Sequence, residues 1–197
     1  MMTKHTWIQL AGAGLATLLF AGCVAVTKVE TGQTVVSERL VLNVASSWNR
    51  FERGQADNTP TWTKEGITVD ALQFYVGVKE GQVISSGPRD SKDAPLTFKA
   101  GMQPAEVVAL FQAMHTRTGS TFSLDKLEPT EFVGSKGFRY EFSVTRKVDD
   151  VMLRGVAYGA IRNGELFVIS YTAPRLAFFA KYVQQVEALA RGATVKG

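Results

Sequence analysis

Cysteine and histidine are the scarcest reactive residues of this 197-residue chain. Its only cysteine is Cys23, and its two histidines are His5 and His115. A single thiol excludes a disulfide within the chain and a zinc site built from several thiolates. A conventional catalytic zinc site needs three protein ligands, which this histidine content does not favour. We therefore expect no metal site, no cofactor and no catalytic residue of these types.

The chain also has little net charge. It carries 22 Lys and Arg residues against 18 Asp and Glu residues, for a formal net charge of +4. Such a small excess, spread along the chain, is not typical of nucleic-acid binding, and we expect it to serve solubility rather than an anionic partner. No serine lies in a Gly-x-Ser-x-Gly motif, and residues 134–137 lack the frame of a phosphate-binding loop. These absences predict a protein that is not an enzyme.

One long apolar run is present, at residues 8–22, after a polar segment whose only fixed charge is Lys4. A charged start, an apolar stretch and small residues at its end are typical of an export signal. The run ends in Phe20-Ala21-Gly22-Cys23, which resembles the lipobox of bacterial lipoproteins, with Phe20 in place of the usual leucine. The resemblance implies cleavage before Cys23 and lipid on its sulfur, and two or more acyl chains give stable membrane anchoring.

This assignment sets the expected organisation of the chain. Residues 1–22 form a signal peptide, residues 23–37 a lipidated N-terminus and short tether, and residues 38–195 a single domain. Val24, not an aspartate, follows the cysteine, and the sorting tendency of the family then favours the outer membrane, facing the periplasm. Three alternatives remain: an uncleaved transmembrane helix, a conventionally cleaved secretory signal, and an apolar first helix in a cytosolic protein.

Alternating apolar and polar residues dominate the rest of the chain and predict strands. They are expected at residues 39–45, 68–78, 138–145, 151–161 and 166–172. Asn163-Gly164 predicts a tight hairpin between the last two. Apolar residues at helical spacing predict one helix that begins at Pro104 and a second over 175–191. The expected fold class is α+β, with an antiparallel sheet covered by two amphipathic helices.

The order of these elements resembles the PsbP-like fold, an α/β/α sandwich. An opening strand runs into Trp48, further strands and a Pro-started helix follow, and a meander through residues 138–172 leads to a closing helix. The family often has a proline shortly before that tryptophan, where this chain has Ala45-Ser46-Ser47. The resemblance implies non-enzymatic binding or assembly, which is an analogy from fold.

Trp48, Arg50 and Trp62 are the predicted partner-binding residues, because aromatic residues beside arginine often anchor interfaces. Burial of both tryptophans in the core is the alternative. The loop at residues 85–95 is a second candidate contact surface. His115 is expected to be a structural residue at the end of a helix, and Asp149-Asp150 is expected to serve a turn.

Together these observations predict a membrane-anchored envelope lipoprotein that acts as a non-catalytic binding or assembly module. Its expected partners are the membrane, through lipid on Cys23, and an envelope protein. A carrier of a small apolar ligand, held between sheet and helix, is one alternative. A carboxylate-dependent hydrolase is the other.

Overall fold

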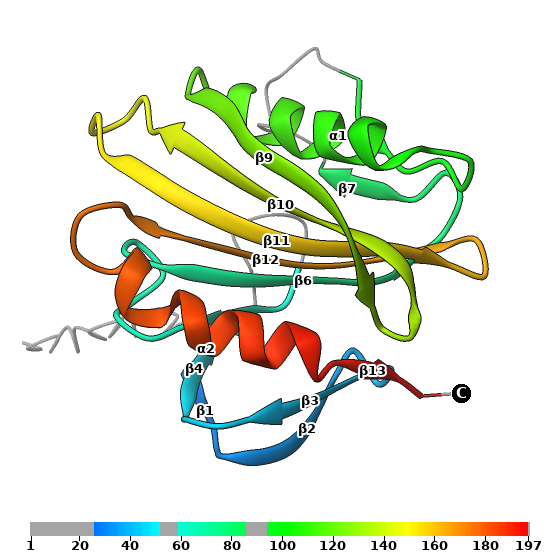
Figure 1. Ribbon diagram of the computed structural model, residues 1–197. Helices are drawn as coiled ribbons and strands as arrows, with labels where there is room; N and C mark the ends of the chain where they lie inside the picture. Colours follow the sequence, from blue (N-terminus) through cyan, green and yellow to red (C-terminus); the bar gives the residue numbers. More distant parts are fainter. Residues whose placement is uncertain (1–25, 52–58, 86–93, 197) are drawn as a thin grey trace, which may run out of the picture.

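The computed structural model describes residues 26–51, 59–85 and 94–196, so Phe20 to Cys23 lie outside the described residues. Two helices and thirteen strands form this part of the chain (Figure 1). In chain order they are β1 (Val26–Val29), β2 (Gly32–Val36), β3 (Leu40–Val44), β4 (Trp48–Phe51), β5 (Thr61–Thr63), β6 (Ala71–Val78), β7 (Val83–Ser85), β8 (Leu96–Thr97), α1 (Pro104–Thr116), β9 (Thr121–Phe132), β10 (Ser135–Thr145), β11 (Met152–Arg162), β12 (Glu165–Pro174), α2 (Phe179–Arg191) and β13 (Thr194–Val195). Neither of these helices is long and apolar enough to cross a bilayer.

An antiparallel sheet of eight strands is the centre of the fold, in the order β1-β4-β5-β6-β12-β11-β10-β9. Strands β9 to β12 form a meander of long hairpins. Asn163 and Gly164 have φ angles of 52° and 77°, which suits the tight turn that their sequence predicts. The expected α+β class is therefore correct.

The expected tether at residues 23–37 is wrong for its described part. β1 pairs with β4, β2 pairs with β3, and β13 lies on the other side of β3 in a small second sheet. The physical reason is that valines with strong strand propensity bury two side chains there, Val29 and Val36, which are only 7% and 5% exposed. The folded domain thus begins at least as early as Val26.

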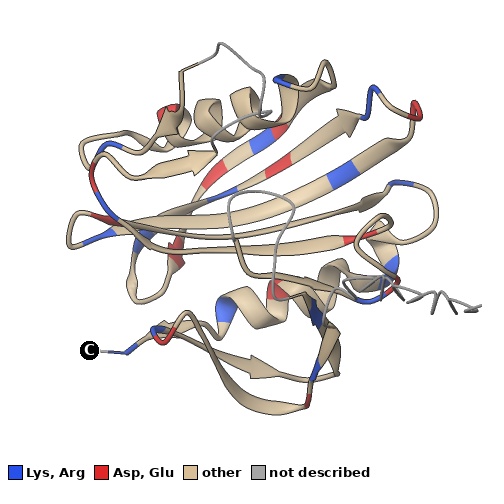
Figure 2. Ribbon diagram, turned by 180° about the vertical axis from the view of Figure 1, so that it is seen from behind, with Lys and Arg blue, Asp and Glu red and all other residues tan. Residues whose placement is uncertain are grey.

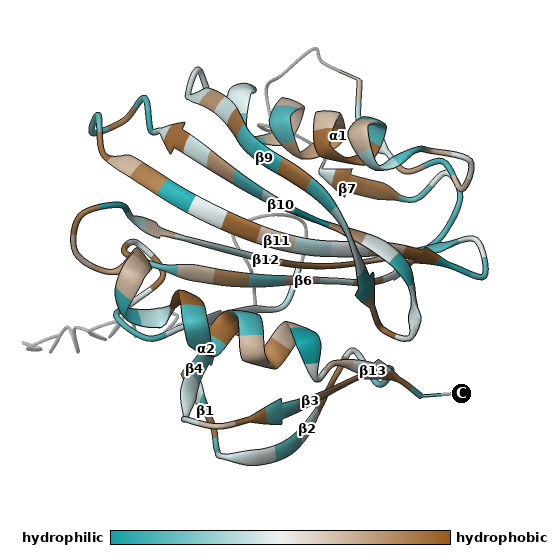
Figure 3. Cartoon of the chain, viewed as in Figure 1, coloured by the Kyte–Doolittle hydropathy of each residue, from teal (hydrophilic) through white to brown (hydrophobic). Residues whose placement is uncertain are grey.

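The sheet separates two apolar clusters. Along β12, Phe167, Ile169 and Tyr171 belong to one cluster, whereas Leu166 and Val168 belong to the other. Because successive side chains of a strand point to opposite faces, the clusters lie on opposite faces of the sheet. Because both faces are covered, consecutive residues of β12 from Leu166 to Tyr171 are buried, and hydrophilic colours lie mainly toward the strand ends and on other strands of the meander (Figure 3).

Each helix contributes to a different cluster. α1 buries Val107, Val108 and Phe111 in the cluster of Tyr140. Pro104 is its first residue, as predicted, and a reciprocal capping box between Gln103 and Glu106 closes its start. On the other face α2 contributes the following buried residues: Phe179, Tyr182, Val186, Leu189 and Ala190.

The second helix starts later than its apolar pattern predicts. Residues 175–178 form a turn, in which the Arg175 amide still donates to the Met152 carbonyl (3.0 Å) as a continuation of the β11–β12 pairing. The Phe178 amide donates to the Pro174 carbonyl (3.2 Å) before the helix begins. Leu176, which lies within the predicted helix, is instead part of this turn and is 98% exposed.

Two glycines of β11 leave room for aromatic rings. A Cβ on Gly155 would lie 2.2 Å from the Phe142 ring, and one on Gly159 would lie 2.5 Å from the Phe138 ring. Both rings belong to the neighbouring strand β10. The glycines therefore allow a row of large aromatic residues to lie flat on the sheet beneath α1.

Candidate functional site

The structure places the three predicted partner-binding residues on the paired strands β4 and β5, with Arg50 opposite Trp62. Trp48 and Trp62 are 3% and 1% exposed and belong to the apolar core, which is the alternative that the sequence left open. Neither indole presents a surface to a partner. Arg50 is exposed on β4, and its Nε donates to the Thr27 hydroxyl (3.2 Å). These residues therefore do not form one contact patch.

Lys64 closes the core over Trp48. Its Nζ lies 4.5 Å from the indole centroid and donates to the Ser46 hydroxyl (2.7 Å) and the Ser47 carbonyl (2.5 Å). Burial lowers the pKa of Lys64. Because this ammonium group stacks on the ring and bonds the adjacent loop, it stabilises the start of β4.

The other residues considered from sequence have local roles. The His115 ring packs against the rings of Phe122 and Phe142, with centroids 5.8 Å and 5.4 Å away, and burial lowers its pKa to about 4. Asp149 pairs with Arg146 (2.7 Å) in the β10–β11 turn. No group of three or more His, Cys, Asp or Glu residues within the described ranges is placed to hold a metal ion. Most of the loop at 85–95 lies outside those ranges.

A cavity of about 210 Å³ lies at the C-terminal end of α1, against the sheet. Its lining mixes apolar side chains such as Met114 and Leu153 with polar ones such as Gln73, His115 and Thr172. It is smaller than the usual range for ligand pockets, about 300 to 1,000 Å³. The cavity therefore gives little support to a carrier of an apolar ligand.

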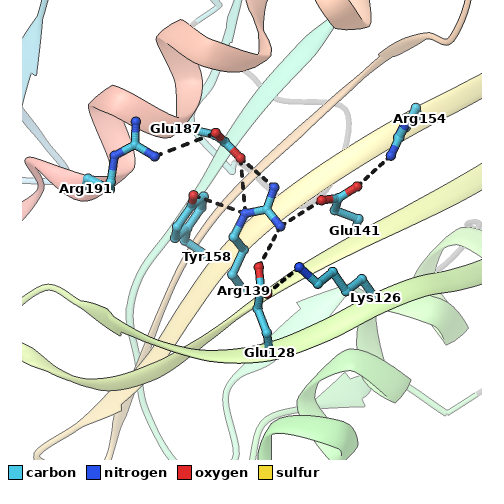
Figure 4. Close-up of polar contacts among 8 residues, drawn as sticks. All are labelled: Lys126, Glu128, Arg139, Glu141, Arg154, Tyr158, Glu187 and Arg191. Carbon is cyan, nitrogen blue, oxygen red and sulfur yellow. Dashed lines mark hydrogen bonds and ion pairs between the residues drawn. The ribbon is translucent and has the colours of Figure 1, made fainter.

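The largest polar cluster surrounds Arg139 on β10 (Figure 4). Its Nη1 donates to Glu128 of β9 (2.9 Å) and to Glu141 (2.8 Å), and its Nη2 donates to Glu187 of α2 (2.5 Å). Its Nε donates to the Tyr158 hydroxyl (3.2 Å). The guanidinium group thus joins β9, β10 and β11 to α2. The Arg139 side chain is only 15% exposed.

Three further cations extend this cluster, which we call the Arg139 network. Arg154 of β11 donates to Glu141 (2.6 Å), Lys126 pairs with Glu128 (2.5 Å), and Arg191 lies 3.7 Å from Glu187. Four cations therefore face three carboxylates. Alternating blue and red bands on the strands of the meander show the same mixture of signs (Figure 2).

The pKa values in the Arg139 network favour the charged forms. Burial raises the pKa of Glu141, but hydrogen bonds from Arg139 and Arg154 outweigh it and hold that pKa below its ordinary value. Lys126, and then Arg139, lower the pKa of Glu128. Burial also opposes the charge of Arg139, yet its bonds to Glu187 and Glu141 raise its pKa. These three residues are fixed ions at neutral pH.

A groove of about 360 Å³ lies beside this network, between α2 and strands β10 and β11. We call it the α2 groove. It is lined by Arg139, Glu141, Arg154, Phe179, Ala180, Val183, Gln184 and Glu187. The strands supply a charged floor, and the first turns of α2 supply a largely apolar wall. This combination suits a ligand group with an apolar body and a charged end.

Arg154 is the most available charged group in the α2 groove. Its side chain is 42% exposed, and its guanidinium carbon lies 5.5 Å from the centroid of the Phe179 ring. Its Nε is buried and makes no hydrogen bond within the described part of the chain, so the exposed part of the side chain is what a ligand could reach. The alternation of charge on β10 and β11 is visible in the sequence, but nothing there shows that α2 brings Glu187 and Phe179 against it.

Comparison with known proteins supports the fold. No family model matches the chain, and no curated protein sequence matches it. Among solved structures, cyanobacterial PsbP (CyanoP) from Synechocystis sp. PCC 6803 matches with a TM-score of 0.54 at 12% identity, over 92% of this chain and 99% of that one. LpqN of Mycobacterium tuberculosis, involved in cell envelope biogenesis, matches with a TM-score of 0.35 at 11% identity over 90% and 88%, which is too distant to support a conclusion. The chain therefore has a PsbP-like fold, as its order of strands and helices predicted.

Proposed function

We propose that this protein is a lipid-anchored envelope protein that holds a protein partner in the α2 groove. The observation that carries the proposal is Arg154, whose side chain is 42% exposed beside the apolar wall of that groove. Arginine next to aromatic and aliphatic surface is typical of the residues that dominate binding energy at interfaces.

The α2 groove is prepared for binding before a partner arrives. Glu141 accepts from both Arg139 and Arg154, so the position of the Arg154 side chain is already restricted. A prearranged side chain loses less entropy on binding than a free one. The partner group that fits best is a carboxylate against Arg154, next to an apolar side chain against Phe179 and Val183.

The exposed face of α2 extends this surface. Ala180, Lys181, Gln184, Gln185 and Ala188 are exposed along it. A stable interface buries about 800 Å² on each partner, which is more than the groove alone offers. We infer that two amphipathic helices cover the sheet. We also infer that α2 takes part in binding, because it leaves the Arg139 network partly uncovered.

The chemistry of the Arg139 network favours binding over hydrolysis. A carboxylate-dependent hydrolase needs a general acid whose pKa is raised toward neutrality. Glu128 and Glu141 have lowered pKa values and remain ionised. Both therefore act as charged anchors for Arg139 rather than as proton donors.

The anchor itself rests on Phe20-Ala21-Gly22-Cys23 and the apolar run before it. The proposed location is the outer membrane, with the domain facing the periplasm. Labelling cells with palmitate tests the anchor: the native protein should carry label, and Cys23→Ser should carry none and keep its signal peptide. Label retained in Cys23→Ser would refute this part of the proposal.

Charge reversal tests the groove. Arg154→Glu should reduce the yield of the partner crosslinked in intact cells by at least about tenfold, because loss of a binding hot spot costs about 2 kcal/mol or more. Lys99→Glu is the matched control, since it reverses one exposed charge that takes no part in the groove. Equal yields from the two variants would show that the partner binds elsewhere.

A further inference from the structure

Two neighbouring loops expose apolar side chains at one end of the domain. Leu176, in the turn before α2, is 98% exposed, Val148 in the β10–β11 loop is 87% exposed, and Met152 is 52% exposed. Val151 and Pro174 join Met152 and Leu176 in one apolar depression. We call this surface, made of Val148, Val151, Met152, Pro174 and Leu176, the apolar tip.

Val151 packs in part against the core cluster of Tyr140, whereas Val148, Met152 and Leu176 are exposed and belong to neither cluster. The bond from the Arg175 amide to the Met152 carbonyl holds the turn before α2 against the start of β11. Leu176 therefore projects into solvent because the backbone directs it there, although α2 begins only three residues later. Single exposed apolar residues are common on protein surfaces, but several that cluster on adjacent loops indicate a contact surface.

The described chain begins at Val26, three residues after the proposed anchor. Cys23 precedes Val26, the first residue of β1, by three residues, which span at most about 10 Å. At the other end of β1, Val29 pairs with Trp48, whose ring lies 6.4 Å from that of Tyr182 in the first turn of α2. The loops after β10 and β12 and the start of α2 all lie toward the left of Figure 1. A membrane that holds Cys23 would therefore lie within reach of Val26, on the edge strand of the same sheet whose strands β11 and β12 carry Met152 and Pro174 of the apolar tip.

The charges around the apolar tip suit a lipid surface. Arg146, Lys147 and Arg175 outnumber the two acids of the β10–β11 loop, Asp149 and Asp150. Arg146 and Asp149 form an ion pair with each other. Lys147 and Arg175 are then the exposed cations that flank the apolar side chains, where they can meet anionic headgroups.

We propose that the apolar tip inserts into the surface of the membrane that carries the lipid anchor, and that this second contact fixes the orientation of the domain. Leu176 and Val148 enter the boundary between headgroups and acyl chains, while α2 leads away from the membrane toward its C-terminal end at Arg191. The α2 groove then faces the aqueous side. This proposal rests on lipidation of Cys23, which is part of the proposed function.

A fluorescent probe at the apolar tip tests the insertion. The processed, lipidated protein carrying Leu176→Cys is labelled with an NBD group and placed in phosphatidylethanolamine–phosphatidylglycerol vesicles. Lipid on Cys23 leaves residue 176 as the only reactive thiol. Val83→Cys is the matched control, because Val83 is an exposed apolar residue on β7, outside the tip. NBD emission at residue 176 should shift to shorter wavelength and be quenched by doxyl-labelled lipid, and emission at residue 83 should do neither.

The possible outcomes distinguish a failure of the proposed lipid anchor from a failure of the proposed insertion. If the protein fails to float with the vesicles, the lipid anchor is refuted and the insertion with it. If the protein floats but the probe at residue 176 stays in a watery environment, the anchor stands and the insertion is refuted. If the probe is shielded only in native membranes and not in protein-free vesicles, the tip binds a protein instead, which also overturns the proposal.

Discussion

Replacement of Arg139 by methionine removes the cation that joins β9, β10 and α2. Methionine keeps much of the unbranched aliphatic stem, so the change mainly deletes the guanidinium group. That group donates hydrogen bonds to Glu128, Glu141, Glu187 and the Tyr158 hydroxyl. Its loss leaves three carboxylates near one another with less compensation, and we expect the α2 end of the sheet to be destabilised.

The burial of Arg139 determines how much the free energy of unfolding should fall in Arg139→Met. Breaking a fully buried ion pair by removing one partner costs about 3–5 kcal/mol, whereas an exposed pair contributes about 0–1 kcal/mol. Arg139 is only 15% exposed, but its carboxylate partners are 19–33% exposed. We therefore expect Arg139→Met to lower the free energy of unfolding by about 2–3 kcal/mol. For a domain of this size that corresponds to a fall in Tm of about 4–12 °C.

Urea unfolding at pH 7, followed by the fluorescence of the buried Trp48 and Trp62, measures this loss. Lys126→Met is the control, because Lys126 is 57% exposed and should cost less than about 1 kcal/mol. The deficit of Arg139→Met should also shrink below pH 4.5, the ordinary pKa of Glu141, since protonation removes the charge that Arg139 compensates. A loss no larger than that of Lys126→Met would refute the reasoning.

Two further variants test the packing of the opposite face. Gly155→Ala should lower the free energy of unfolding by about 1–3 kcal/mol, because the new Cβ would lie 2.2 Å from the Phe142 ring; Gly155→Ala combined with Phe142→Leu should recover part of that loss if the clash is the cause. His115 has a pKa of about 4 in the folded protein against 6.5 when unperturbed, so the unfolded state binds the proton first as pH falls. Stability should therefore decline from pH 6.5 to pH 4 by up to about 3 kcal/mol, and a His115→Gln variant with an unchanged decline over that range would contradict this assignment.

Period-two alternation and turn residues predict the late meander of this chain well. Phe138, Tyr140, Phe142 and Val144 all point to one face, and Asn163-Gly164 turns as expected. The long strand β9 is not predicted by alternation, because its residues are mostly exposed and show little alternation at this edge of the sheet. β1 and β2 were missed because they are short and pair with β4 and β3, whose positions depend on the rest of the sheet.

The sequence predicts the candidate site less well than it predicts the fold. Tryptophan next to arginine predicts an interface at Trp48 and Arg50. Trp48 is instead buried in the core, where the side chains of Lys64 and Tyr182 pack against its ring. The Arg139 network joins residues from β9, β10, β11 and α2. Local patterns show that Glu128, Arg139 and Glu187 are polar, but only the packing of α2 on the sheet brings them into contact.

Photocrosslinking in intact cells tests the central claim, that the α2 groove of a membrane-anchored domain binds a partner. A photoreactive amino acid is placed at Gln184, exposed beside the groove, and at Gln112, exposed on α1 as the control. We predict one discrete adduct from residue 184 that Arg154→Glu abolishes, and no such adduct from residue 112. Adducts of equal yield from both positions, or an adduct at residue 184 that survives Arg154→Glu, would contradict the claim.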